Sequence, residues 1–195
     1  GSEMCIRDRD MLELVQKLHR EKNITVIMVT HKISEALMAD RVYILDNSKI
    51  VAEGTPEDVF TDVERLKKYG LEIPVRMKLE AGIPVDICSE YKKKHLQISQ
   101  DAGVSVDHIG DSGNSLSNLR RCIVELQNVS YSYMNGNEEY KALSDIDLKI
   151  YEGQVVSVIG QTGSGKSTLL QMINKLIAPQ SGHVYLYETD VQRVR

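Results

Sequence analysis

Cysteine is scarce in this chain, and its three cysteines are badly placed for cross-links. Cys5, Cys88 and Cys122 lie far apart and form no C-x-x-C pair. An odd number of scattered cysteines is typical of reduced thiols in a cytosolic setting. We therefore expect neither a disulfide framework nor a zinc site.

Long apolar runs and long basic runs are also missing. The longest apolar segments, such as residues 24–29, fall far short of the roughly 20 residues that a membrane-spanning helix needs. The net charge is -4, and the lysines at 92–94 are best interpreted as a solvated helix face. We expect no transmembrane helix and no nucleic-acid partner, so work at a membrane would require a partner protein.

What the chain does have is enough apolar sequence for a globular core. Its 195 residues are 42% hydrophobic and 27% charged, which suits one domain or two small ones. Residues 1–9 lack apolar periodicity and begin with Gly-Ser, as cloning remnants do, so we leave them out of the fold prediction. Helical apolar spacing predicts a helix from Asp10 to about Glu21.

The most specific pattern is G-Q-T-G-S-G-K-S-T at residues 160–168, which matches the phosphate-binding motif G-x-x-x-x-G-K-[ST]. A Gly-rich turn lets several backbone N–H groups approach a polyanion closely. Lys166 would reach the outer phosphates, and the Ser167 hydroxyl would ligate Mg²⁺. The predicted nucleotide site comprises Gly160, Gln161, Thr162, Gly163, Ser164, Gly165, Lys166, Ser167 and Thr168.

The segments on either side of this loop have the order that phosphate binding requires. A β-branched run at residues 154–159 predicts a strand, and apolar spacing over residues 167–177 predicts a helix. The N-terminus of that helix would add its dipole to the anion site.

The remaining segments alternate between buried strands and short helices. Thr55 and Pro56 have the residue types of a helix cap and first turn. Further strands are predicted at residues 24–29, 41–45, 49–53, 123–133, 142–151 and 183–187, and further helices at 34–39, 62–69 and 89–96.

Residues 30–60, from T-H-K-I-S-E-A-L to T-P-E-D-V-F, resemble the second half of an ABC transporter ATPase domain. In that family a strand leads to the switch histidine, which contacts the γ-phosphate, and the resemblance implies this catalytic role for His31. Residues 71–74 and 82–84 resemble the small C-terminal extension of energy-coupling factor (ECF) transporter ATPases.

Asp46 allows two interpretations. It ends the run V-Y-I-L-D, which superficially resembles a Walker B strand with a Mg²⁺-binding carboxylate, but Asn47 stands where ABC enzymes have the catalytic glutamate. The resemblance favours a turn residue, a role in which aspartate bonds to its own backbone.

Residues 122–195 resemble the first half of an ABC ATPase domain, with an antiparallel β subdomain before the phosphate loop. In this family an aromatic residue ahead of a Gly-containing turn stacks on adenine. Tyr133 matches that position best and Tyr131 second best, whereas packing in a core is the ordinary role of a strand tyrosine.

The two halves come in the reverse order for one enzyme, which predicts a junction between tandem ATPase domains. Residues 10–96 would end one domain, residues 97–121 form a Ser-, Asp-, Gly- and Asn-rich linker, and residues 122–195 begin the second. We expect an α/β fold: a partial P-loop NTPase core with a parallel sheet and an antiparallel β subdomain. The resemblance implies that the strand at 155–159 lies between those at 24–29 and 41–45. We expect the three to pair within this chain as a permuted partial domain that brings His31 near Lys166.

The resemblance implies an ATP-binding fragment of an ABC transporter of ECF type, with ATP and Mg²⁺ as cofactors. The implied partners are a second ATPase domain or subunit, a transmembrane coupling subunit and a substrate-binding membrane subunit, at the cytoplasmic face of the cell membrane. The Q-loop, the L-S-G-G-Q signature and the Walker B glutamate do not occur in the sequence, so we expect nucleotide binding with little or no hydrolysis. The alternatives are another P-loop enzyme, such as a small-molecule kinase with Asp46 on Mg²⁺, or an inert truncated chain.

Overall fold

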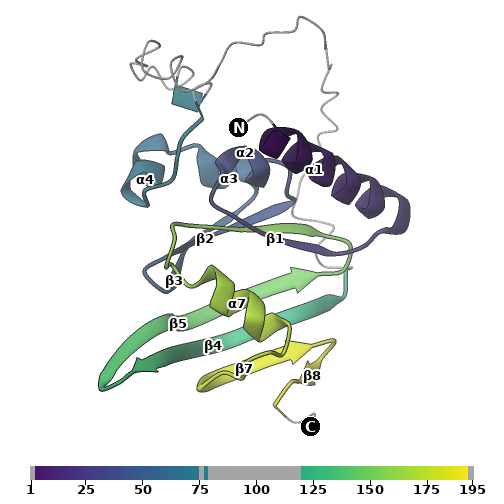
Figure 1. The fold of residues 1–195 in the computed structure, drawn as a ribbon. Helices are drawn as coiled ribbons and strands as arrows, with labels where there is room; N and C mark the ends of the chain where they lie inside the picture. The colour runs from purple at the N-terminus through teal and green to yellow at the C-terminus, as the bar shows by residue number, and fades with distance from the viewer. Residues whose placement is uncertain (1–2, 75–76, 79–119, 193–195) are drawn as a thin grey trace, which may run out of the picture.

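The computed structural model describes residues 3–74, 77–78 and 120–192, with side chains from residue 11 onward. Several predicted features lie outside the described residues: Cys88, the lysines at 92–94, the element at 82–84, the helix at 89–96 and nearly all of the linker. The described chain forms two four-stranded sheets with short helices around them (Figure 1).

The first sheet combines strands from both halves of the chain. Its order is β1 (Val26–Thr30), β6 (Val155–Ile159), β2 (Arg41–Asp46) and β3 (Lys49–Gly54). β6 runs parallel to β1 on one side and to β2 on the other, while β2 and β3 form an antiparallel hairpin. The predicted α/β class is confirmed, and the three strands pair as the permuted arrangement requires.

The second sheet is antiparallel throughout and comes only from the C-terminal half. Its order is β5 (Glu138–Tyr151), β4 (Cys122–Asn135), β7 (Ser181–Leu186) and β8 (Thr189–Asp190). β5 begins four residues before the predicted strand at 142–151, because the tight turn at Gly136 (φ 63°) lets the two strands pair up to their ends.

Within the described residues, helices occur where they were predicted, but their limits differ. The α1 helix spans Glu3–Lys22, so leaving out residues 3–9 was wrong: this segment has no glycine or proline to interrupt a helix. The remaining helices are α2 (Ile33–Ala36), α3 (Pro56–Phe60), α4 (Val63–Lys68) and α7 (Lys166–Ile173).

Local signals explain two of these helix ends. Thr55 caps α3 as predicted, because its side chain accepts from the Asp58 N–H while the Asp58 carboxylate accepts from the Thr55 N–H. The helix after the phosphate loop stops four residues before the predicted end. Lys175 adopts φ 60°, and the Leu176 N–H reaches back to the Gln171 carbonyl at 2.8 Å, which closes α7.

Strand β6 is buried on both faces, as its nearly continuous apolar sequence predicts. Val156 and Val158 point to one face and pack with α7 and the antiparallel sheet. Val155 and Ile159 point to the other face and pack with α2, α3 and α4. This alternation places the loop that follows β6 between two apolar layers.

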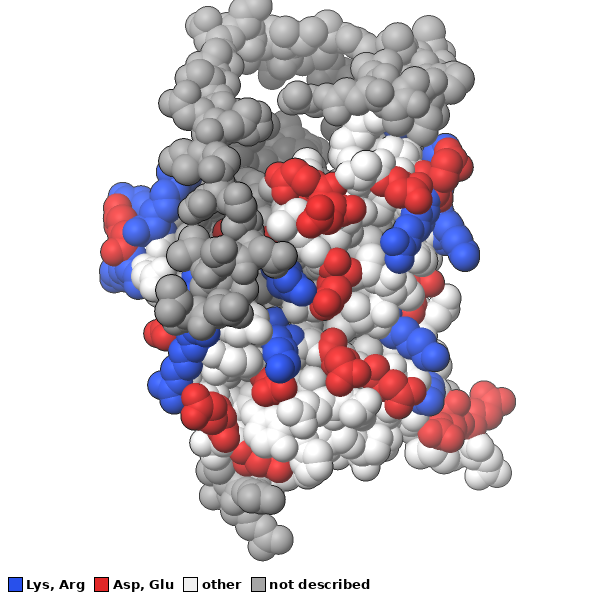
Figure 2. All heavy atoms as spheres, turned by 180° about the vertical axis from the view of Figure 1, so that it is seen from behind, with Lys and Arg blue, Asp and Glu red and all other residues white. Residues whose placement is uncertain are grey.

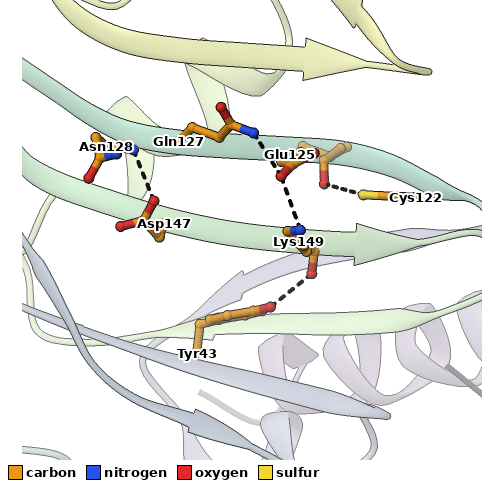
Figure 3. Close-up of polar contacts among 8 residues, drawn as sticks. Tyr43, Cys122, Glu125, Gln127, Asn128, Asp147 and Lys149 are labelled. Atoms are coloured by element: carbon orange, nitrogen blue, oxygen red, sulfur yellow. Dashed lines mark hydrogen bonds and ion pairs between the residues drawn. The ribbon is translucent and has the colours of Figure 1, made fainter. Parts of the chain in front are cut away.

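Polar contacts also join the two sheets. The buried Tyr43 hydroxyl on β2 donates to the carbonyl of Lys149 on β5 at 2.8 Å (Figure 3). Ser48 donates through its hydroxyl to the Lys141 carbonyl at 2.6 Å and accepts at its own carbonyl from the Ser144 N–H at 2.8 Å. The antiparallel sheet is therefore tied to the β2–β3 hairpin by directional bonds as well as by apolar packing.

The rear face carries mixed charge, with acidic and basic side chains intermingled (Figure 2). Ion pairs join Arg41 to Glu53 at 3.2 Å and Lys149 to Glu125 at 3.1 Å. Among the described helices, none has the length and apolar character needed to cross a membrane.

Candidate functional site

The phosphate-binding motif begins at the carboxyl end of the central strand of the mixed sheet. Ile159, the last residue of β6, pairs with Thr30 of β1 and with Ile44 of β2. Gly160 and His31 therefore leave neighbouring parallel strands at the same edge, where strands lie about 4.8 Å apart. The structure thus brings the two predicted site segments together from opposite ends of the chain.

His31 lies in a turn that neighbouring residues stabilise. The buried Thr30 hydroxyl donates to Glu35 and accepts from the Lys32 N–H at 3.0 Å. Lys32 forms an ion pair with Glu35 at 2.9 Å. The imidazole of His31 itself is exposed, so its side chain is accessible at this edge of the sheet.

At two positions of the loop, other backbone segments lie so close that only glycine fits. A Cβ on Gly160 would lie 2.1 Å from the Leu45 carbonyl oxygen. A Cβ on Gly165 would lie 2.2 Å from the Ala142 carbonyl oxygen, and this residue also has φ 107°. The loop is therefore packed between β2 and β5, with no space for larger residues at these positions.

Lys166 folds back over its own loop. Its ammonium group donates to the carbonyls of Gly160, at 2.8 Å, and of Gln161, and to the Ser164 hydroxyl at 3.3 Å. Partial burial lowers the pKa of Lys166 below its ordinary value of 10.5, because desolvation disfavours the charged form. These three partners are neutral oxygens. A bound phosphate group would therefore supply the negative charge that they do not.

The start of α7 fits an anionic ligand. Gly165 caps the helix without any side-chain hydrogen bond to the first-turn N–H groups, and the first turn contains no acidic residue. Such N–H groups carry the positive end of the helix dipole. The Ser167 side chain is exposed there, whereas Thr168 is buried. The residues present therefore fit a polyphosphate, with the Ser167 hydroxyl placed as an oxygen ligand for Mg²⁺.

The two candidate adenine-stacking tyrosines have different environments. Tyr133 is 40% exposed, and its hydroxyl lies 3.4 Å from the Thr168 hydroxyl and 3.3 Å from the Gln171 side-chain oxygen. Tyr131 packs against the core and meets the Tyr133 ring edge-on at a centroid distance of 5.0 Å. Of the two, Tyr133 has the ring that reaches the phosphate-loop helix and stays partly open to solvent.

Asp46 lies at the end of β2 in the hairpin to β3. Its carboxylate accepts from the Asn47 side-chain amide at 3.0 Å, and Asn47 and Ser48 both adopt positive φ in the turn. Asp46 therefore lies beside a turn, as the resemblance favoured, although the bond to its carboxylate comes from the Asn47 side chain and not from the backbone.

Sequence reasoning missed two contacts of the loop. The Tyr140 hydroxyl on β5 donates to the Gly163 carbonyl at 2.8 Å. The Gln161 side chain lies against Gly70, where a Cβ would be 1.3 Å from its amide nitrogen. The turn residues N-G-N at 135–137 indicate a hairpin that sets Tyr140 opposite Tyr133, but they do not indicate that the Tyr140 hydroxyl reaches the loop.

The strand, glycine loop and helix together define a P-loop nucleotide-binding core. Residues 143–195 match the family model described as ABC transporter. The chain is 32% identical over 196 residues to an ABC transporter ATP-binding protein of Caldanaerobacter subterraneus, covering 93% of this chain and 33% of the relative. It is 28% identical over 204 residues to one of Methanosarcina mazei, covering 94% and 33%.

The comparison with solved structures gives a short local match. A dimeric ATP-binding cassette in a post-hydrolysis state bound to ADP and phosphate is 40% identical to this chain, over 37% of this chain and 32% of the other, with a TM-score of 0.36. On the sequence matches, residues 143–195 resemble the ABC transporter family, and this chain is similar over most of its length to ABC transporter ATP-binding proteins. It spans about one third of the length of the curated relatives that it matches.

Proposed function

We propose that this chain is the junction of two tandem ABC ATPase domains and that its phosphate loop binds the ATP of the second. Residues 10–96 would end the first domain, residues 97–121 link the two, and residues 122–195 begin the second. The proposal is supported by the relatives, since a single stretch of one third of their length aligns with over nine tenths of this chain.

The observation that carries the binding function is the geometry of the phosphate loop. Lys166 is held over the loop by its own carbonyls, and the N–H groups at the start of α7 have no side-chain cap. When ATP binds, Lys166 would exchange its contacts with the loop carbonyls for the outer phosphates, and the helix start would hold the phosphates through backbone N–H groups. Mg²⁺, held by Ser167 and the phosphates, would neutralise part of their charge.

Two further residues would complete the nucleotide contacts. The half-exposed ring of Tyr133 would stack on adenine, with its position set by the bonds to Thr168 and Gln171. His31 would contact the γ-phosphate from the neighbouring strand, since Thr30 and Ile159 are register partners.

Turnover and transport belong, in this proposal, to the longer protein. The chain has no L-S-G-G-Q signature, Q-loop or Walker B glutamate, so it has no group to polarise an attacking water and no signature to close over the γ-phosphate. The parent would be an ECF-type importer ATPase at the cytoplasmic face of the membrane, working with a second ATPase domain, a transmembrane coupling subunit and a substrate-binding membrane subunit. The main support for the ECF type is the sequence L-E-I-P at residues 71–74 with the preceding Gly70.

Calorimetric titration with Mg²⁺-ATP tests the binding function. Lys166→Ala should weaken ATP binding about 10- to 100-fold, the range expected when a hydrogen bond to a charged group is lost. Lys22→Ala is the matched control, because Lys22 lies in the last turn of α1, before β1, whereas the loop follows the opposite end of the parallel strands. It should bind as the unmodified chain does.

Two outcomes would contradict the proposal. Absence of ATP binding by the unmodified chain would favour an inert fragment. Mg²⁺-dependent transfer of phosphate to a small acceptor would favour a kinase, in which case Asp46→Asn should abolish the transfer.

A further inference from the structure

Tyr140 reaches the phosphate loop from a direction that the nucleotide contacts above do not use. It lies on β5 directly opposite Tyr133 on β4, so both side chains project from the same face of the hairpin. Their hydroxyl groups reach different targets: Tyr133 contacts the helix α7, whereas Tyr140 donates to the Gly163 carbonyl at 2.8 Å. The Tyr140 side chain is 54% exposed, so apolar burial does not explain this placement.

The bond from Tyr140 completes the support of one peptide unit. The N–H of Ser164 donates to the Gln161 carbonyl at 3.2 Å, which closes the turn from Gln161 to Ser164. The carbonyl of Gly163 belongs to the same planar peptide and points the opposite way, toward Tyr140. This peptide is therefore held at both ends, from inside the loop by Gln161 and from outside by Tyr140.

Without the outer bond, this peptide would have considerable freedom. Gly163 adopts φ 83°, and a Cβ built there meets only the Tyr140 hydroxyl, at 3.7 Å. A glycine in such open surroundings populates several backbone conformations. In some of them the carbonyl would turn toward the phosphates, and a carbonyl oxygen facing an anion is repulsive.

We propose that Tyr140 is a positioning residue for the phosphate loop, which holds the Gly163 carbonyl outward and so keeps the loop ready to receive a polyphosphate. This inference rests on the proposed function and adds a residue to it. The bond from Tyr140 would lower the conformational entropy that the loop loses when a ligand binds. This effect applies to the polyphosphate part of any nucleotide, whatever the base.

The test compares Tyr140→Phe with Tyr187→Phe, titrating each with ATP and with inorganic tripolyphosphate. Tyr140→Phe keeps the ring and removes only the hydroxyl, so affinity should fall about two- to tenfold, and by the same factor for both ligands. Tyr187→Phe also removes only a hydroxyl, from an exposed tyrosine beside Ile123 at the opposite end of β4 from the loop contacts, and should leave the binding of both ligands unchanged. Amide NMR signals of Gly163 and Ser164 should broaden in Tyr140→Phe alone, as the peptide begins to exchange between conformations.

The possible failures point to different conclusions. Unchanged tripolyphosphate affinity and unchanged Gly163 signals in Tyr140→Phe would overturn this inference and leave the proposed function intact. A loss confined to ATP would make Tyr140 a contact to the base and would overturn it as well. If the unmodified chain binds neither ligand, the proposed function fails, and the role of Tyr140 fails with it.

Discussion

The two sheets differ in the length of chain that separates their paired strands. In the antiparallel sheet, β4 and β5 are consecutive and pair from Asn135 and Glu138 outward. In the mixed sheet, β6 pairs with strands that lie more than one hundred residues earlier, as in the pair of Val155 with Val26. Distant pairings form only after a large loop-closure entropy has been lost. The β4–β5 hairpin is thus local structure, whereas the mixed sheet requires both halves of the chain.

The candidate site draws on both sheets. The loop and Lys166 follow β6 of the mixed sheet, while Tyr133 and Tyr140 come from the antiparallel sheet. Changes to one sheet should therefore alter the site in a way that changes to the other do not.

Val158→Asp in the middle of β6 should have the largest effect. Val158 is fully buried between Val29 and Tyr43, so the new carboxylate would have no solvent and no partner. We expect a loss of at least about 4 kcal/mol in the free energy of unfolding, measured by urea titration. Hydrogen exchange should show lost protection in β1, β2 and β6, with more protection kept in the β4–β5 hairpin.

The matched control for that change is Leu176→Asp. Leu176 is 73% exposed after the end of α7, so its substitution should shift stability by no more than about 0.5 kcal/mol. If Val158→Asp loses protection equally in both sheets, the sheets unfold as one unit. The β4–β5 hairpin would then not be more independent than the mixed sheet.

Tyr43→Phe should weaken the joint between the sheets. The Tyr43 hydroxyl donates to the Lys149 carbonyl (Figure 3). It also accepts from the Arg41 side chain at 3.1 Å. Burial raises the pKa of Tyr43, so the hydroxyl stays protonated and able to donate. Its removal leaves a carbonyl without this donor, and we expect a loss of about 1–2 kcal/mol in unfolding free energy.

Tyr187→Phe provides the comparison for this change. Tyr187 is 58% exposed, and its loss of a hydroxyl should have little effect on unfolding. A stability for Tyr43→Phe equal to that of Tyr187→Phe would show that the apolar packing alone joins the sheets.

Much of this fold could be predicted because its elements carry local signals. The buried run of β6, the glycine loop and the Thr55 cap each depend on residues close in sequence, and the structure has them where they were predicted. Strand order could not be predicted from local signals, because the apolar pattern shows that a strand is buried but not which strands lie beside it. That order came from the resemblance to ABC ATPases, and β6 does lie between β1 and β2.

The contacts around the site were harder to predict. The motif identifies the loop residues, but the bond from Tyr140 depends on how the antiparallel sheet lies against the loop. The contact between Gln161 and Gly70 likewise joins two segments from opposite halves of the chain. Neither follows from spacing, because each depends on packing between segments whose relative position the sequence pattern does not contain.

The smallest predicted effect concerns the proton on Lys166. Because desolvation lowers its folded-state pKa below 10.5, the folded chain loses this proton at lower pH than the unfolded chain does. Stability due to Lys166 should therefore rise with pH between those two pKa values, since the unfolded chain binds more protons there.

Bound polyphosphate favours the charged lysine, so tripolyphosphate affinity should fall as pH rises through the same window. In Lys166→Arg the guanidinium keeps its charge throughout, and this part of the pH dependence should vanish while other titrating groups stay common to both proteins. An identical affinity profile for the two proteins would show that the charge on Lys166 does not contribute to phosphate binding, and the loop would then bind through its backbone alone.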